Sequence, residues 1–212
     1  MIPTMLFTWL QGADFYYNLH KEAVDSLPRG NGKIWLDVGC GPGLVARLAA
    51  ERGYQTTGMD ADVYMIQSAK WIATRQGLSI DFKTGDAFNL PMESADVVSA
   101  ASLLAVLGDK VSGLNSLWKC VRPGGTLLII EPTDRMTNEN VNQLIKNGLP
   151  RKRITGLKMW ATARQGNIVN PAIYETLEAD TVKFTPLLNG LVGAWAILKQ
   201  TMPYDVVFAS AL

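Results

Sequence analysis

The stretch Ile34-Trp-Leu-Asp-Val-Gly-Cys-Gly-Pro-Gly43 passes from an apolar strand directly into a glycine-rich turn. The residues that follow, 44–51, place apolar side chains at helical spacing. Glycines without side chains let the backbone of the turn adopt positive φ and approach a ligand closely. A strand, a tight glycine turn and a helix in this order predict the front of a nucleotide-binding βαβ unit.

The spacing of the glycines distinguishes between classes of nucleotide. A dinucleotide fingerprint, G-x-G-x-x-G, needs glycine where this chain has Leu44, and Gly43 comes one residue early. A phosphate loop needs G-K-[ST], and no such sequence follows. Asp37 ends the strand, where a carboxylate repels a pyrophosphate but attracts an ammonium group. We interpret the ligand as a cationic, amine-bearing nucleoside, which disfavours an NAD-dependent dehydrogenase.

The segment Leu36–Gly43 resembles the first motif of the class I S-adenosylmethionine-dependent methyltransferases, with its acid and all three glycines in register. The resemblance implies that S-adenosyl-L-methionine is the cofactor and S-adenosyl-L-homocysteine the product. It implies that the cofactor contacts five residues of this stretch, namely Asp37, Gly39, Cys40, Gly41 and Gly43.

A second predicted strand, Tyr54–Asp60, ends in an acid 23 residues after Asp37. A carboxylate can accept two hydrogen bonds and so matches the vicinal hydroxyls of a ribose. The resemblance assigns that role to Asp60. Asp62 is the alternative, but it is better placed to cap the next predicted helix, Val63–Gln76.

A third predicted strand, Ser79–Thr84, leads into Gly85-Asp-Ala-Phe88. Family members carry a similar segment, which implies that Asp86 meets the adenine amino group while Ala87 and Phe88 flank the ring. The alternative is an ordinary turn after a strand. The resemblance adds three further cofactor-binding residues, Ala61, Met65 and Ala100.

The later elements complete a fold class. Ala95–Ala101 is a short and mostly apolar run, as expected of a central strand buried on both faces. A helix over Val111–Val121 precedes Arg122–Pro132, where Pro123 and two glycines are predicted to end the helix and begin a fifth strand. Strand-like runs on both sides of Asn189-Gly190 predict a hairpin. The prediction is an α/β, Rossmann-like, seven-stranded, mostly parallel sheet with helices on both faces and a C-terminal antiparallel β-hairpin.

The 212 residues are predicted to form a single methyltransferase domain. Four parts are expected. They are an N-terminal helical cap (residues 1–32), a cofactor-binding core (33–132), a substrate-capping segment (133–179) and the C-terminal hairpin (180–200). Another helix is expected to start at Asn170 and Pro171.

The N-terminal cap contains a predicted helix over Phe15–Leu27 with Asp14 as its cap residue. It places Tyr16, Tyr17 and His20 within one turn. In the family this helix often folds over cofactor and substrate, which implies that the three residues line the pocket. Alternatively, the tyrosines pack on the core and the histidine lies on the surface.

The capping segment is basic. From 140 to 174 the chain has no Asp or Glu and six basic residues. A basic cap favours an anionic substrate, although such a run is often just a solvated face. Within it Trp160 could form an apolar wall, and Glu131, at the end of the fifth strand, could contact substrate or be solvated. The six basic residues are Lys146, Arg151, Lys152, Arg153, Lys158 and Arg164.

Composition excludes several classes of protein. The chain is 48% hydrophobic and 18% charged with a net charge of +1, which suits a globular protein and gives no global signal for nucleic acid. The N-terminus is too short and lacks the basic residues for a signal peptide, and no run has membrane-spanning length. Two cysteines, Cys40 and Cys120, make no disulfide framework, so we expect a cytoplasmic protein. A single histidine, His20, excludes a multi-histidine metal site, and no metal is expected.

We therefore expect transfer of a methyl group to an O, N, S or C atom of a small molecule by an enzyme similar to the quinone-biosynthesis-type methyltransferases. The general base stays open between His20, Glu131 and the two tyrosines, and no residue is assigned as catalytic. Many relatives carry histidines where this chain has Ala105 and Val106. Two alternatives are a non-catalytic cofactor-binding module and an RNA methyltransferase that uses the basic segment. Oligomeric state is not predicted.

Overall fold

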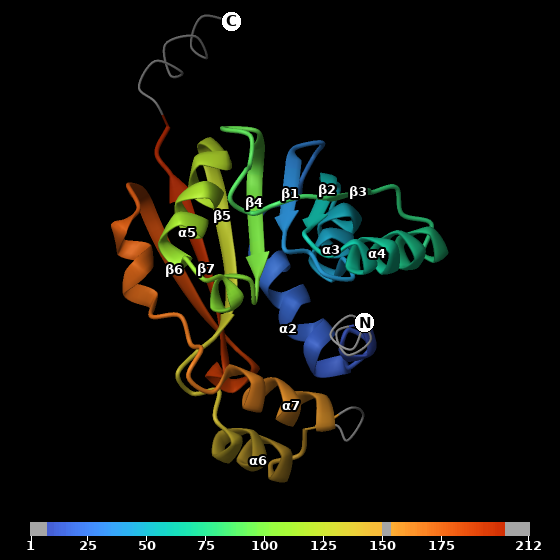
Figure 1. Cartoon of the computed structure of the whole chain (residues 1–212), viewed down its shortest axis with the longest axis vertical. Helices are drawn as coiled ribbons and strands as arrows, with labels where there is room; N and C mark the ends of the chain where they lie inside the picture. The colour runs from blue at the N-terminus through green and yellow to red at the C-terminus, as the bar shows by residue number, and fades with distance from the viewer. Residues whose placement is uncertain (1–7, 150–153, 202–212) are drawn as a thin grey trace, which may run out of the picture.

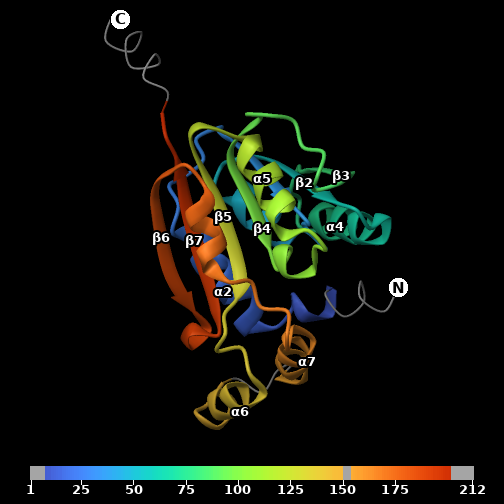
Figure 2. The same ribbon diagram turned by 60° about the vertical axis from the view of Figure 1, so that its left-hand side comes forward.

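The computed structural model describes residues 8–149 and 154–201. Within these residues seven strands form one sheet in the order β3-β2-β1-β4-β5-β7-β6, with helices on both faces (Figures 1 and 2). Strands β1 to β5 are parallel, and β7 is antiparallel to both of its neighbours. The predicted fold class is confirmed. The strands are β1 Ile34–Val38, β2 Gln55–Asp60, β3 Asp81–Thr84, β4 Ala95–Ala101, β5 Val121–Pro132, β6 Ala179–Leu187 and β7 Val192–Lys199.

The main helices in the described residues are α2 Asp14–Asp25, α3 Leu44–Glu51, α4 Val63–Arg75, α5 Lys110–Cys120, α6 Asn138–Lys146 and α7 Ile154–Arg164. Three short 3-10 turns are η1 Leu104–Val106, η2 Pro171–Thr176 and η3 Leu188–Gly190. The basic residues 151–153 lie outside the described residues, so their predicted role in the cap stays a prediction.

Strand β1 illustrates how the layers form. Trp35 packs on the face covered by α2 and α3, with its ring 4.8 Å from that of Tyr54. Leu36 packs on the opposite face with Leu117 of α5. Successive side chains of a strand point to opposite faces, and helices cover both faces of a parallel sheet. Every residue of β1 after Ile34 is therefore buried.

The parallel strands end at one edge of the sheet, and α6 and α7 lie beyond it (Figure 1). Helix α7 packs against the N-terminal region. The ring of Trp160 lies 5.4 Å from that of Tyr16, and a Cβ on Gly156 would lie 2.6 Å from the side chain of Leu10. The N-terminal region and α7, which are far apart in the sequence, thus meet over the edge where open α/β sheets bind ligands.

Strands β6 and β7 pair as the predicted hairpin. Their connection is the turn η3, in which Leu188, Asn189 and Gly190 all have positive φ, of 46°, 55° and 80°. Asparagine and glycine adopt this conformation more readily than other residues. The Asn-Gly signal therefore identified the reversal, although the connection is longer than two residues.

Two predicted helix starts differ in the structure. Helix α2 begins at Asp14 itself, and Ala13 occupies the N-cap position without a side-chain hydrogen bond. Asp14 is thus not the cap residue, and it lies in the first turn, where the helix dipole favours a negative charge. Asn170 does cap the later element by accepting a hydrogen bond from the Ala172 N–H, but that element is the 3-10 turn η2.

The Pro-Gly-Gly sequence lies within β5 and not at the end of a helix, since α5 ends at Cys120. A Cβ on Gly125 would lie 2.7 Å from the carbonyl oxygen of Asp96 in β4. Gly124 has a φ of 72°. The glycines therefore let the start of β5 approach β4 closely, which a side chain would prevent.

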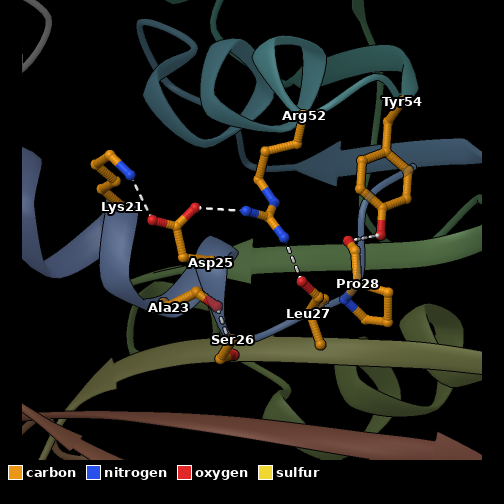
Figure 3. Close-up of polar contacts among 8 residues, drawn as sticks. All are labelled: Lys21, Ala23, Asp25, Ser26, Leu27, Pro28, Arg52 and Tyr54. Carbon is orange, nitrogen blue, oxygen red and sulfur yellow. Dashed lines mark hydrogen bonds and ion pairs between the residues drawn. The ribbon is translucent and has the colours of Figure 1, made fainter. Parts of the chain in front are cut away.

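Arg52, just after α3, fixes the C-terminal end of α2 (Figure 3). Its Nη1 donates to the Asp25 carboxylate at 2.7 Å, and its Nη2 donates to the Leu27 carbonyl. The hydroxyl of Tyr54 donates to the Pro28 carbonyl at 2.8 Å, while Lys21 pairs with Asp25 at the surface. These bonds attach α2 to the first βα unit of the sheet.

Cys40 and Cys120 are both buried and free. In the part of the chain that the structure describes, no helix combines the length and apolar character needed to cross a membrane.

Candidate functional site

A cavity of about 330 Å³ lies at the carboxyl ends of β1, β2 and β4. Its floor is the glycine turn that follows β1, and its walls come from the segments after β2, β3 and β4. Tyr16 and His20 of α2 and Arg164 of α7 close the opposite side. Cavities of this size bind small molecules and cofactors.

The three glycines of the turn contribute in two different ways. Gly39, Gly41 and Gly43 all have positive φ, of 66°, 51° and 78°. A Cβ on Gly39 would lie 2.7 Å from Leu103, and one on Gly43 would lie 2.7 Å from Phe82. A Cβ on Gly41 would meet nothing within 4 Å. Gly41 is thus the glycine whose missing side chain opens space toward the cavity, whereas Gly43 serves packing and does not line the cavity.

A buried arginine supports the turn. Arg47 of α3 is 5% exposed, and its Nη1 donates to the Pro42 carbonyl at 2.6 Å. Its Nη2 donates to Gln11 Oε1 at 3.1 Å, which connects the turn to the residues before α2. Gln11 and Pro42 both line the cavity and were not predicted as site residues.

Asp37 lies at the end of β1 and is 1% exposed. Its Oδ1 accepts from the Ser99 hydroxyl at 2.7 Å, and its Oδ2 accepts from the Ala46 N–H at 3.1 Å. Ser99 in turn accepts from the Trp35 indole at 2.8 Å. Burial raises the pKa of Asp37 to about 7, against the effect of these two hydrogen bonds. The carboxylate is therefore held in place and sensitive to a positive charge beside it.

Asp60 lies at the end of β2 and lines the cavity. Its Oδ2 accepts from the Gly41 N–H at 2.8 Å, and its Oδ1 accepts from the Asp62 N–H at 2.9 Å. Each carboxylate oxygen has a second lone pair, so both oxygens can still accept from a ligand hydroxyl. Asp62 instead caps α4 by accepting from the Tyr64 N–H, as predicted.

The segment after β3 supplies Gly85, Asp86 and Ala87 to the cavity wall. Asp86 Oδ1 accepts from the N–H of Phe88 at 3.0 Å, which closes a tight local turn. The Phe88 ring is 43% exposed and lies outside the cavity lining.

On the opposite side, His20 is buried, and its Nδ1 lies 2.7 Å from the Tyr16 carbonyl oxygen. A carbonyl accepts hydrogen bonds, so the proton is on Nδ1, and Nε2 keeps its lone pair. No group among the described residues bonds to Nε2. Burial lowers the pKa of His20 to about 4, so the ring is neutral near pH 7. Burial raises the pKa of Tyr16, so that hydroxyl keeps its proton.

Glu131 and Trp160 lie behind the cavity wall and not in it. Glu131 is 1% exposed, and its Oε2 has no hydrogen-bond partner among the described residues. Burial raises its pKa to about 7, which the positive charge of Arg164 partly offsets. Tyr17, in contrast, is 37% exposed and does not line the cavity.

The structure brings together most of the residues predicted to bind the cofactor. Six predicted site residues do not line the cavity, namely Gly43, Phe88, Ala100, Tyr17, Glu131 and Trp160. Predicted residues that line the cavity are Asp37, Gly39, Cys40, Gly41, Asp60, Ala61, Met65, Asp86, Ala87, Tyr16 and His20. No group of three or more His, Cys, Asp or Glu side chains among the described residues could hold a metal ion.

Sequence reasoning missed the lining residues that follow β4 and the end of α7. The former include Ser102 and Leu103, which come directly after Ala101 at the end of β4, and their position after a buried strand was a usable signal. Arg164 was one of six basic residues in its segment, and the pattern gave no reason to separate it from the others.

Residues 36–129 match a family model described as a methyltransferase domain. A curated relative, the ubiquinone biosynthesis O-methyltransferase of Idiomarina loihiensis, is 28% identical over 164 residues. The alignment covers 76% of this chain and 65% of the relative, so the chain spans slightly less than two thirds of that protein's length.

Solved structures share the fold at lower identity. Protein mmp1179 of Methanococcus maripaludis aligns with a TM-score of 0.68 and 15% identity, covering 94% of this chain and 92% of that chain. The [4+2]-cyclase SpnF aligns with a TM-score of 0.56 and 22% identity, covering 88% of this chain and 82% of that chain. Because one of these structures is a cyclase, the fold alone does not specify the reaction.

Proposed function

We propose that this chain, which belongs to the class I S-adenosylmethionine-dependent methyltransferases, transfers the methyl group of S-adenosylmethionine to a small molecule. The observation that carries the proposal is the cavity after β1, β2 and β4, where Asp37, Asp60 and the open face of Gly41 converge. The match of residues 36–129 to a methyltransferase domain supports it independently.

The residues present fit this cofactor. Asp60, oriented by two backbone N–H groups, would accept hydrogen bonds from the ribose hydroxyls. Asp37 would attract the ammonium group, and Asp86 would accept from the adenine amino group. The missing side chain of Gly41 leaves room for the ligand to approach the backbone. The same acids would repel the pyrophosphate of NAD.

When bound, the cofactor supplies a methyl group on a positively charged sulfur, whose C–S bond breaks as the acceptor forms its bond to carbon. The chain has to align the acceptor and exclude water, and alignment contributes on the order of 7–11 kcal/mol. Helices α2 and α7 close the cavity opposite the glycine turn and would hold the acceptor there.

We infer that the acceptor atom is an oxygen, because the curated relative is an O-methyltransferase. A hydroxyl must lose its proton as it is methylated, and a positioned base contributes about 10²–10⁴-fold. Of the four candidate bases, Tyr16 keeps its own proton, while Glu131 and Tyr17 do not line the cavity. His20 presents a free Nε2 lone pair there, so we assign it as the proton acceptor.

Replacing His20 by alanine is expected to lower kcat by about 10²-fold or more on a hydroxyl acceptor. Because no cofactor-binding role is assigned to His20, its variant should bind S-adenosylhomocysteine as the wild type does. Steady-state kinetics and calorimetry on the same preparation measure both quantities. A kcat close to the wild-type value would exclude His20 as the base.

Transfer of a labelled methyl group from S-adenosylmethionine to a panel of small hydroxyl compounds tests the function. We expect at least one methylated product, which is lost in Asp60→Ala and retained in Asp81→Ala, an exposed acid at the start of β3. Label that appears on RNA and on no small molecule would overturn the assignment of the acceptor. Cofactor binding without transfer to any acceptor would favour a non-catalytic module.

A further inference from the structure

Arg164 is the last residue of α7, and it lines the cavity although it is 6% exposed. Of the described residues in the cavity wall, it is the one with a positively charged side chain, since His20 is neutral. Three aspartates face the same cavity, Asp37, Asp60 and Asp86. A buried arginine in such a wall requires an explanation, because an unpaired buried charge is costly.

The guanidinium has unused hydrogen-bonding capacity. Its Nη2 donates to the Ser102 carbonyl at 3.3 Å, and its Nε is buried without a partner. No described residue forms an ion pair with it. A guanidinium carries five N–H donors, so Arg164 has N–H groups left to donate to the oxygens of a ligand.

Glu131 does not neutralise Arg164. The positive charge of Arg164 lowers the pKa of Glu131, but burial outweighs it and raises that pKa to about 7. The Glu131 Oε2 also accepts no hydrogen bond from the described residues, so the carboxyl does not pair with the guanidinium. Arg164 therefore keeps a positive charge that no group in the described protein fully compensates.

Arg164 and Asp37 both line the cavity, and their charges reach one common group in its wall. Asp37 precedes the turn after β1, and Ser102, which holds the guanidinium, follows the neighbouring strand β4. The charges of both residues act on the pKa of the Tyr16 hydroxyl. A negative and a positive side chain thus flank one corner of the cavity.

We propose that Arg164 binds the carboxylate of the methionine part of S-adenosylmethionine, whose ammonium group Asp37 attracts. An α-amino acid carries an ammonium and a carboxylate on one carbon, and the two side chains match these charges in sign and proximity. The inference rests on the proposed function. Since α7 belongs to the capping segment, the cofactor would join that segment to the glycine turn.

Calorimetry with S-adenosylmethionine and its decarboxylated analogue tests the proposal, because the analogue keeps the sulfonium and the amine. The wild type is expected to bind S-adenosylmethionine roughly 10- to 100-fold more tightly than the analogue. Arg164→Gln should remove this difference, because it should weaken the binding of S-adenosylmethionine and leave the binding of the analogue unchanged. Lys158→Gln, an exposed charge on the same helix, should keep the difference.

Three results would overturn the proposal. Equal affinity of the wild type for both ligands would show that no group binds the carboxylate, and this measurement requires no variant to fold. If Arg164→Gln still bound S-adenosylmethionine more tightly than the analogue, another residue would bind the carboxylate. Arg164 would then be free to bind an anionic acceptor. A wild type that binds neither ligand would reject the proposed function as well, which distinguishes the two failures. Arg164→Lys, which keeps the charge, should retain part of the difference in affinity between the two ligands. It provides a second test in case Arg164→Gln does not fold.

Discussion

At the scale of single residues, Asp37 couples the cofactor site to pH. Because its pKa is about 7, a growing fraction of the free protein carries a proton there as the pH falls through 7. An ammonium group beside the carboxylate favours the ionised form and lowers this pKa. Binding of S-adenosylhomocysteine below pH 7 should therefore release a proton, and affinity should fall as pH falls from 8 to 6.

Calorimetry in buffers of different ionisation enthalpy measures this proton release. Asp37→Asn should abolish it and weaken binding. Asp81→Asn is the control, because Asp81 is an exposed acid at the start of β3 and does not line the cavity. Proton release that survives in Asp37→Asn would contradict the assignment of the ammonium group to Asp37.

Gly41 and Gly32 provide a matched pair. Both have positive φ, of 51° and 82°, and a Cβ on either would meet nothing within 4 Å. Alanine at either position is strained by about 1 kcal/mol, so both variants should lose similar stability in a denaturant titration. Only Gly41→Ala adds a methyl group to the cavity floor, so it alone should weaken the binding of S-adenosylhomocysteine at least tenfold. Equal affinities of the two variants would mean that the ligand does not approach Gly41.

At the scale of elements, the position of α2 determines where Tyr16 and His20 enter the cavity. Arg52 attaches the end of this helix to Asp25 and to the Leu27 carbonyl (Figure 3). Arg52→Ala should lower the free energy of unfolding by about 1 kcal/mol, because it removes two hydrogen bonds of a partly buried group. Lys21→Ala, which breaks a surface pair with the same aspartate, should change stability little. Chemical denaturation compares the two, and equal losses would contradict a special role for Arg52.

The elements also show what the sequence could predict. The βα units were readable because each depends on local patterns, such as the apolar run of β4 or the cap at Asp62. The start of α2 was misplaced because Asp14 fits the first helical turn as well as the cap position. The Pro-Gly-Gly sequence was assigned to the helix end because its actual role, close contact with Asp96 of β4, depends on a neighbouring strand.

At the scale of the whole molecule, the cavity joins two groups of residues that the sequence reveals to different degrees. The floor was predictable, because Asp37, Gly41 and Asp60 lie in short motifs at the ends of consecutive strands. The opposite side depends on how α2 and α7 pack together, which no local pattern encodes. That packing buries Trp160 against Tyr16 and brings Arg164 into the wall while leaving Tyr17 outside.

Calorimetric titration of the wild type with S-adenosylhomocysteine and with NAD tests the central claim most directly. We predict that S-adenosylhomocysteine binds and that NAD does not. At about 100 times its dissociation constant, the nucleoside should also add roughly 2.7 kcal/mol to the stability of the protein. Binding of NAD without binding of S-adenosylhomocysteine would contradict the interpretation of the glycine turn and, with it, the proposed methyl transfer.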